Sequence, residues 1–135
     1  MNLSNPESKH ACKSMVALVA TMLPLLIWLP GAQAGIAGHG AKVFDEECAE
    51  CHSVQPGKNK KGPALFGVSG RSAGSVPDYD YSAAMKSSGV TWTADRLDAY
   101  ITAPRKQVPG CKMKYDGLSS ASARADLIEF LNNLR

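Results

Sequence analysis

The chain has 135 residues, of which 44% are hydrophobic and 20% are charged, and its formal net charge is +3. This length and composition fit one globular domain, and no repeat or low-complexity tract interrupts it. The charge is too small to indicate nucleic-acid binding, and no basic stripe is interleaved with aromatic residues.

The N-terminal segment has the pattern of a secretory signal peptide. Two lysines give it a basic start, an apolar run follows at Met15–Leu29, and the small residues Ala32-Gln33-Ala34 offer a cleavage site. We therefore predict a signal peptide at 1–34, export to the periplasm, and a mature domain at 35–135. An uncleaved membrane anchor and a buried core helix are the alternatives, although a span needs roughly 20 apolar residues.

Removing the leader leaves few side chains that can bind a metal. The leader holds two of the 15 basic and one of the 12 acidic residues, so the mature net charge becomes +2. A domain this small has a thin core, which a large apolar cofactor would enlarge. The remaining cysteines, methionines and histidines are Cys48, Cys51, Cys111, Met85, Met113, His39 and His52.

Three helices and no strand are predicted in the mature domain. The first carries apolar residues on one face, from Ala37 through Phe44 to Cys51, and ends near Pro56. The second begins at the N-cap Thr93 and stops at Pro104.

The third helix is predicted at about Ser120–Leu134, with leucine and phenylalanine at helical spacing, and a shorter helix at 82–86. The stretches 57–77 and 104–117 are predicted as loops. The sequence therefore indicates an all-α fold whose long loops surround a rigid bound group.

The residues Cys48-Ala49-Glu50-Cys51-His52 form the C-x-x-C-H pattern of covalent haem attachment. Two thiols three residues apart on a helix share a face and can add to the two vinyl groups on one porphyrin edge. His52 then points toward the iron, for which imidazole is a good ligand. The sequence predicts one haem c, covalently bound through Cys48 and Cys51, with His52 on the iron.

Three other uses of this motif remain open. Cys48 and Cys51 could form a disulfide or a buried pair, or a thioredoxin-like redox pair, although the βαβ context of the latter is not visible. A zinc site would need four ligands from these cysteines, His52 and Cys111.

The second axial ligand of the iron is predicted to be Met113. It follows the irregular stretch 108–112, which could cross the haem face, and Met/His ligation raises the potential of cytochromes. Met85 lies in a helical piece and is expected in the core, and His39 is expected at the surface. Cys111 is most simply a small buried hydrophobe.

The segment 40–134 resembles a class I c-type cytochrome of the mitochondrial or bacterial c2 type. Its Lys61–Gly67 resembles the Gly-Pro-x-Leu-x-Gly loop of that family, and Val108–Met113 resembles the Pro-Gly-Thr-Lys-Met ligand loop. In one departure, Cys111 replaces the threonine, and a thiol is a weaker hydrogen-bond donor that could also compete as a soft ligand. Further matches in order are Gly40, Phe44, Tyr81, Gly89–Trp92, Tyr100, Pro104–Lys106, Leu127 and Phe130.

The resemblance implies an all-α cytochrome fold, with three main helices and long loops around one haem, and gives roles to five pocket residues. The carbonyl of Pro63 would accept the Nδ1 proton of His52. Arg71, Tyr81 and Trp92 would contact the haem propionates, and Tyr100 would lie near the methionine sulfur.

The function expected from this site is electron transfer rather than catalysis, because no substrate pocket or acid–base pair is evident. The expected partners are redox proteins such as membrane cytochrome complexes, oxidases or dehydrogenases, met by a monomer that touches a membrane only transiently or through an uncleaved leader. A pentacoordinate haem sensor or peroxidase-type protein, and a subunit of a larger oxidoreductase, are the alternatives. A basic rim for such partners is expected from Lys58, Lys60, Lys61, Lys86, Lys106, Lys112 and Lys114.

Overall fold

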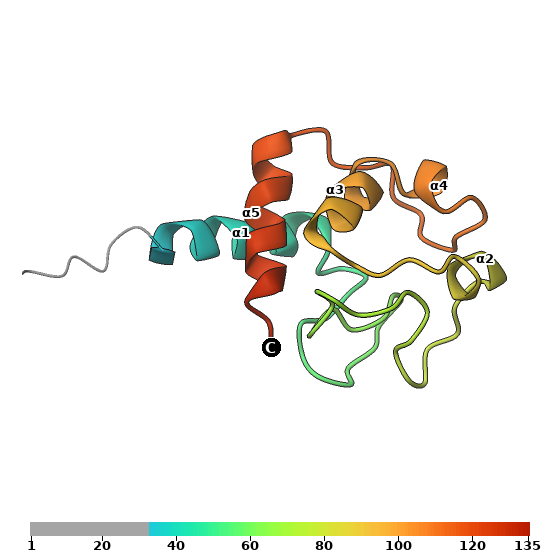
Figure 1. Cartoon of the computed structure of the whole chain (residues 1–135). Coiled ribbons are helices and arrows are strands. Elements are labelled where there is room, and N and C mark those ends of the chain that lie inside the picture. The colour runs from blue at the N-terminus through green and yellow to red at the C-terminus, as the bar shows by residue number, and fades with distance from the viewer. Residues whose placement is uncertain (1–32) are drawn as a thin grey trace, which may run out of the picture.

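A computed structural model describes residues 33–135 of the chain. Figure 1 shows helices joined by long loops, and the described residues contain no strand, only an isolated bridge between Ser72 and Thr91. The all-α prediction is confirmed. The helices are α1 (Gln33–Glu47), α2 (Ala83–Lys86), α3 (Ala94–Thr102), α4 (Pro104–Gln107) and α5 (Ala121–Asn132).

Serine and threonine side chains start three of the helices, as the sequence predicts for α3 and α5. The hydroxyls of Ser82, Thr93 and Ser120 accept hydrogen bonds from backbone N–H groups in the first turns of α2, α3 and α5. Each hydroxyl satisfies a donor that the helix itself leaves without a partner.

The crossing of α1 and α5 joins the two ends of the described chain (Figure 1). A Cβ atom on Gly40 would lie 2.1 Å from the carbonyl oxygen of Asp126 and 2.6 Å from Cβ of Phe130, so only glycine lets the helices come this close. The rings of Phe44 and Phe130 then meet at 5.8 Å between centroids.

The predicted first helix is wrong at its C-terminal end. The apolar spacing predicts a helix through Cys51 to near Pro56, but α1 ends at Glu47. The carbonyl of Phe44 accepts hydrogen bonds from both Cys48 and Ala49, at 2.8 and 2.9 Å, and the second of these spans five residues, which departs from the α-helical pattern. Cys48–Cys51 therefore form a turn, although the N–H of His52 still reaches the carbonyl of Cys48 at 2.9 Å.

The prediction of a loop throughout 104–117 is wrong at its start, where the first residues form the short helix α4. Pro104 does end α3, yet it also opens α4, because proline suits the first position of a helix, where no N–H partner is needed.

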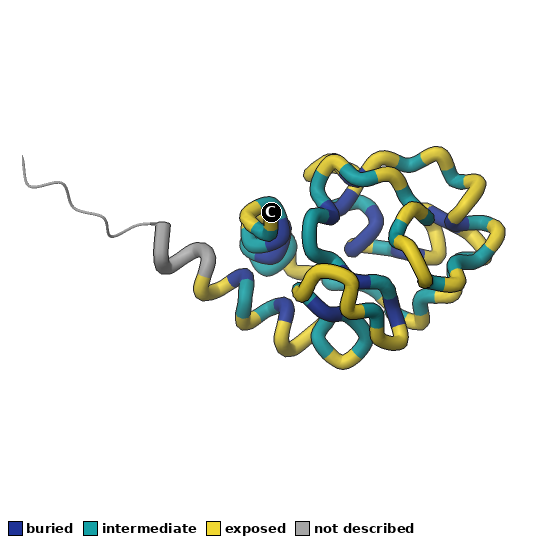
Figure 2. Tube along the Cα trace, turned by 90° about the horizontal axis from the view of Figure 1, so that it is seen from below, coloured by how far each residue is buried: buried dark blue, intermediate teal, exposed yellow. Residues whose placement is uncertain are grey.

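The loops contribute to the core as well as to the surface. Buried positions alternate with exposed ones along the loop trace in Figure 2. Ala64, Val68 and Val108 are each at most 4% exposed, and Leu127 on α5 is 1% exposed. None of the helices in residues 33–135 is both long and apolar enough to cross a membrane.

Candidate functional site

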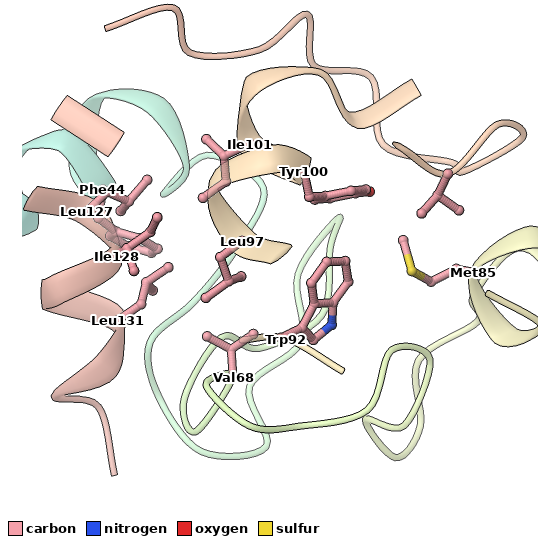
Figure 3. Close-up of a cluster of buried hydrophobic side chains, with 11 residues drawn as sticks. Phe44, Val68, Met85, Trp92, Leu97, Tyr100, Ile101, Leu127, Ile128 and Leu131 are labelled. Carbon is pink, nitrogen blue, oxygen red and sulfur yellow. The ribbon is translucent and has the colours of Figure 1, made fainter. Parts of the chain in front are cut away.

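A cavity of about 390 Å³ lies between α3, α5, the turn after α1 and the loops. Its walls are mainly aliphatic and aromatic, and they join the core cluster drawn in Figure 3. Apolar walls of this kind suit a large flat cofactor with few polar groups. The aliphatic residues that line the cavity are Leu65, Val68, Leu97, Ile101, Leu127 and Leu131.

Every residue that the sequence predicts at the site lines this one cavity. These residues come from segments that are far apart in the chain, and the fold brings them together. They are Cys48, Cys51, His52, Pro63, Arg71, Tyr81, Trp92, Tyr100 and Met113.

The imidazole of His52 is held by the loop that follows it. Its Nδ1 lies 2.8 Å from the carbonyl oxygen of Pro63 and donates to it, which leaves the lone pair of Nε2 for a metal. Burial lowers the pKa of His52, against the opposing effect of the Pro63 carbonyl, so the ring is neutral near pH 7. A neutral imidazole with one nitrogen available is the form that binds iron.

The backbone of Gly62 lies directly against the His52 ring. A Cβ atom at this position would lie 2.3 Å from Cε1 and 2.7 Å from Nδ1 of that ring. The N–H of Gly62 also donates to the carbonyl of Cys51 at 2.7 Å, so the loop is fastened to the residue before the histidine.

The two cysteines of the motif carry free thiols at the cavity wall. Burial, followed by the charge of Glu47 and the neighbouring Cys51, raises the pKa of Cys48 to about 12. Cys48 is therefore a neutral thiol near pH 7.

Two of the alternative uses of the motif, a disulfide and a zinc site, find no support in the described residues. Cys48, Cys51 and Cys111 are all unpaired, so no disulfide joins them. Within residues 33–135, no group of three or more histidine, cysteine or acidic side chains is placed to hold a metal ion, which leaves the zinc alternative without a ligand set.

Polar groups of the other predicted residues also meet the cavity. Arg71 donates to the carbonyls of Phe66 and Ala64 at 2.8 and 2.9 Å, so its guanidinium is fixed beside the wall. The rings of Trp92 and Tyr100 pack at 4.9 Å between centroids, as Figure 3 shows.

Three sulfur-containing residues line the cavity together with Tyr100. Met85, Cys111 and Met113 line the cavity with it, and Met85 is only 8% exposed, which confirms its predicted place in the core. Cys111 is half-buried, and burial and then Cys111 raise the pKa of Tyr100. The phenol therefore stays protonated and can donate a hydrogen bond toward the cavity.

Sequence reasoning missed Glu47 and Tyr115, which both line the cavity. The hydroxyl of Tyr115 donates to Oε2 of Glu47 at 2.7 Å, across a sequence separation of 68 residues. Each residue lies close to a predicted ligand, Glu47 directly before Cys48 and Tyr115 two residues after Met113. That proximity was the available signal, but nothing in the sequence indicated that the two side chains meet.

The residues present therefore fit a haem. Two thiols, one imidazole with a free nitrogen and one thioether face an apolar cavity whose wall also carries hydrogen-bond donors. The fold and this site define a small all-α haem protein.

Comparison with known proteins agrees with this class. The sequence profile of the cytochrome c family matches residues 37–135. Cytochrome c 2.1 of Caenorhabditis briggsae is 47% identical over 98 residues, which are 73% of this chain and 88% of that protein. Cytochrome c type-1 of Ascaris suum is 44% identical over 103 residues, 76% of this chain and 92% of that protein.

A solved structure has the same fold. Cytochrome cH from Methylobacterium extorquens superimposes with a TM-score of 0.67 at 39% sequence identity, covering 71% of this chain and 96% of that one. The chain belongs to the cytochrome c family, and it is an electron-carrier protein of that family. Its cofactor is haem c, bound covalently through cysteine, and the neighbouring Cys48 and Cys51 are the pair suited to bind it.

Proposed function

We propose that the protein is a periplasmic electron carrier with a single haem c whose iron is bound by His52 and Met113. The observation that carries the proposal is the pair of donors in one apolar cavity: a neutral, oriented imidazole and a thioether. When bound, the haem supplies one-electron chemistry by alternating between its ferrous and ferric states.

The chain's own residues make that chemistry selective. Pro63 fixes the ring orientation and raises the basicity of His52. Met113 would supply the second ligand to the iron, and a thioether would favour the ferrous state and raise the potential. With both donors on the iron, no position would remain there for an exogenous substrate, so the protein would act as a carrier.

Further residues serve the polar edge of the cofactor. Arg71, Tyr81 and Trp92 would supply donors to the propionates, whose burial is costly without hydrogen bonds. The phenol of Tyr100, which lines the same cavity as Met113, would lie near the methionine sulfur.

Replacing the ligand tests the axial assignment. In the purified oxidised protein, Met113→Ala should abolish the methionine-to-iron charge-transfer band while the haem stays covalently attached. Met85→Ala is the matched control, because Met85 lines the same cavity, and it should keep the band. Loss of the band in the control alone would show that the wrong methionine was chosen. Rapid carbon monoxide binding by the unaltered reduced protein would favour a sensor or peroxidase instead.

Export rests on the leader pattern at 1–34, nearly all of which lies outside the described residues. A cleaved leader predicts a mature chain of 35–135 carrying one haem, found in the periplasmic fraction. Intact mass spectrometry of that fraction checks this. A mass that includes the leader, together with membrane association, would support the anchor alternative.

The proposed partners are redox proteins with acidic docking faces, met by a monomer. Lys61, Lys112 and Lys114 surround the mouth of the cavity. Lys61 pairs with Glu50 at 2.5 Å and Lys112 pairs with Asp80, whereas Lys114 forms no ion pair within residues 33–135. Lys114 is therefore the strongest source of attraction for an anion.

Oxidation by ferricyanide, a small anionic oxidant, measures that attraction. The rate should fall as salt rises, because screening weakens the attraction. Lys114→Ala should slow the reaction more than Lys61→Ala at low salt, and the two variants should converge at high salt. Equal rates of the two variants at low salt would show that Lys114 attracts the oxidant no more strongly than Lys61 does.

A further inference from the structure

The segment 112–117, which carries Met113, has no backbone–backbone hydrogen bond to any described part of the chain. The flanking residues do have them: the N–H of Cys111 donates to Val108 at 3.1 Å, and that of Leu118 donates to Ile101 at 3.0 Å. The six residues between these points depend on their side chains for position.

Met113 and Tyr115 pack partly buried against the core. The polar contacts of the segment come from both sides of Met113. On one side, Nζ of Lys112 donates to the carbonyl oxygen of Asp80 at 2.9 Å and also to its carboxylate. On the other side, the hydroxyl of Tyr115 donates to Oε2 of Glu47 at 2.7 Å.

A third contact is weak. Arg105 and Asp116 approach to 4.0 Å, but their side chains are 66% and 99% exposed, and exposed ion pairs of this kind contribute little. The side of the segment that follows Met113 therefore depends mainly on the bond between Tyr115 and Glu47.

We propose that Glu47 and Tyr115 are positioning residues that form a latch across the mouth of the cavity and hold Met113 against the iron. The inference rests on the proposed function of Met113 as ligand. Glu47 is the last residue of α1 and directly precedes Cys48, so the latch ties the ligand segment to the part of the chain that binds the cofactor. A phenol that donates to a carboxylate makes a stronger bond than two neutral groups do.

Opening of the segment must break this bond before Met113 can leave. Burial of the Tyr115 ring, and then its bond to Glu47, raise the pKa of the phenol, so it remains a donor throughout the neutral range. Without the latch, the segment opens more often, and a small external ligand can take the vacated axial position more readily.

Imidazole is the probe for this opening, because it binds ferric haem only when the methionine has left. In the holoprotein, Tyr115→Phe and Glu47→Ala should each tighten imidazole binding by about twofold to tenfold, the effect of losing one solvent-exposed hydrogen bond. Glu46→Ala is the matched control, since it removes a neighbouring carboxylate whose one ion pair within residues 33–135 is with Lys42, at 3.7 Å. It should leave imidazole binding unchanged.

A conservative variant and a double variant distinguish the loss of this one hydrogen bond from a general destabilisation of the segment. Glu47→Gln retains an oxygen that accepts from Tyr115, so it should recover most of the affinity difference. The double variant Glu47→Ala/Tyr115→Phe should match either single variant, because both changes remove one bond. Effects that add, or single variants that bind imidazole like the unaltered protein, overturn the proposal.

Amide hydrogen exchange supplies a second measurement that does not depend on the iron ligand. Both latch variants should speed exchange of the Cys111 and Leu118 amides, whose hydrogen bonds flank the segment, while the amides of α5 keep their rates. The two hypotheses fail on different results. A charge-transfer band retained in Met113→Ala would reject Met113 as the ligand. Unchanged amide exchange in the latch variants would reject the latch.

Discussion

The imidazole of His52 is constrained by single atoms on two sides. The Pro63 carbonyl receives its Nδ1 proton, and the backbone of Gly62 lies where any side chain would strike the ring. The sequence resemblance implied the first contact, and the structure contains the hydrogen bond. The second contact was not foreseen, because a glycine in a loop gives no indication of what faces it.

Gly62→Ala should therefore displace the imidazole. A Cβ atom 2.3 Å from Cε1 requires the ring or the loop to move, which breaks the bond to Pro63 and weakens the axial ligand. We expect the haem to stay attached while the low-spin visible spectrum gives way to a mixture with a high-spin form.

Gly67→Ala serves as the control for this spectrum. Its φ is +63°, so alanine is strained there by about 1–2 kcal/mol, but no atom lies within 4 Å of the added carbon. The control should lose stability and keep its spectrum. A fully low-spin spectrum in Gly62→Ala would show that the loop yields without moving the ring.

At the scale of elements, the crossing of α1 and α5 depends on one position. Gly40→Ala should lower the free energy of unfolding by about 1–3 kcal/mol, because the added carbon overlaps the carbonyl of Asp126 and forces the helices apart. Urea unfolding followed by circular dichroism measures the change.

Gly38 provides the opposite expectation on the same helix. It is exposed, and no atom lies within 4 Å of the point where a Cβ would stand, so Gly38→Ala should stabilise the helix by up to about 1 kcal/mol. Equal effects at the two glycines would mean that the crossing adapts and that close contact is not required.

The element predictions succeeded where a local signal exists. Thr93 and Ser120 cap the helices expected to follow them, because a capping hydroxyl acts within one turn. The end of α1 could not be predicted, because the apolar spacing continues through Cys51 while the Phe44 carbonyl takes two donors and closes the helix at Glu47. Hydrophobic spacing marks a face, and it does not mark where a helix stops.

A further tie between elements was also out of reach from sequence. Arg124 on α5 donates to Asp98 on α3 at 2.7 Å and to the carbonyls of Leu118 and Ser119 at 2.8 and 2.9 Å. Three partners converge on one guanidinium from two segments. Such convergence is a property of tertiary structure, since neither segment contains a pattern that requires it.

Across the whole molecule, the cofactor completes the core. The cavity separates α3 and α5 from the loops, and its walls include Leu127 and Leu131, which are among the least exposed residues. The double variant Cys48→Ser/Cys51→Ser should prevent covalent attachment and leave the space between those walls unfilled. We expect a large loss of helical circular dichroism and of cooperative thermal unfolding.

Cys111→Ser is the control for this prediction. Cys111 lines the same cavity but stands outside the attachment motif, so its variant should keep the haem and unfold cooperatively. A cooperative, helical double variant without haem would contradict the view that the cofactor supplies part of the core.

The contact between Phe44 and Phe130 has a consequence for the order of events during synthesis. Among the described helices, α1 is made first and α5 last, so the partner that α1 crosses does not exist until the others have been translated. Until α5 has been translated, the crossing of α1 and α5 cannot form, and Cys48 and Cys51 lie on an incompletely folded chain. The long separation between these two phenylalanines thus gives the thiols a period of access, during which a porphyrin can enter before the fold shuts behind it.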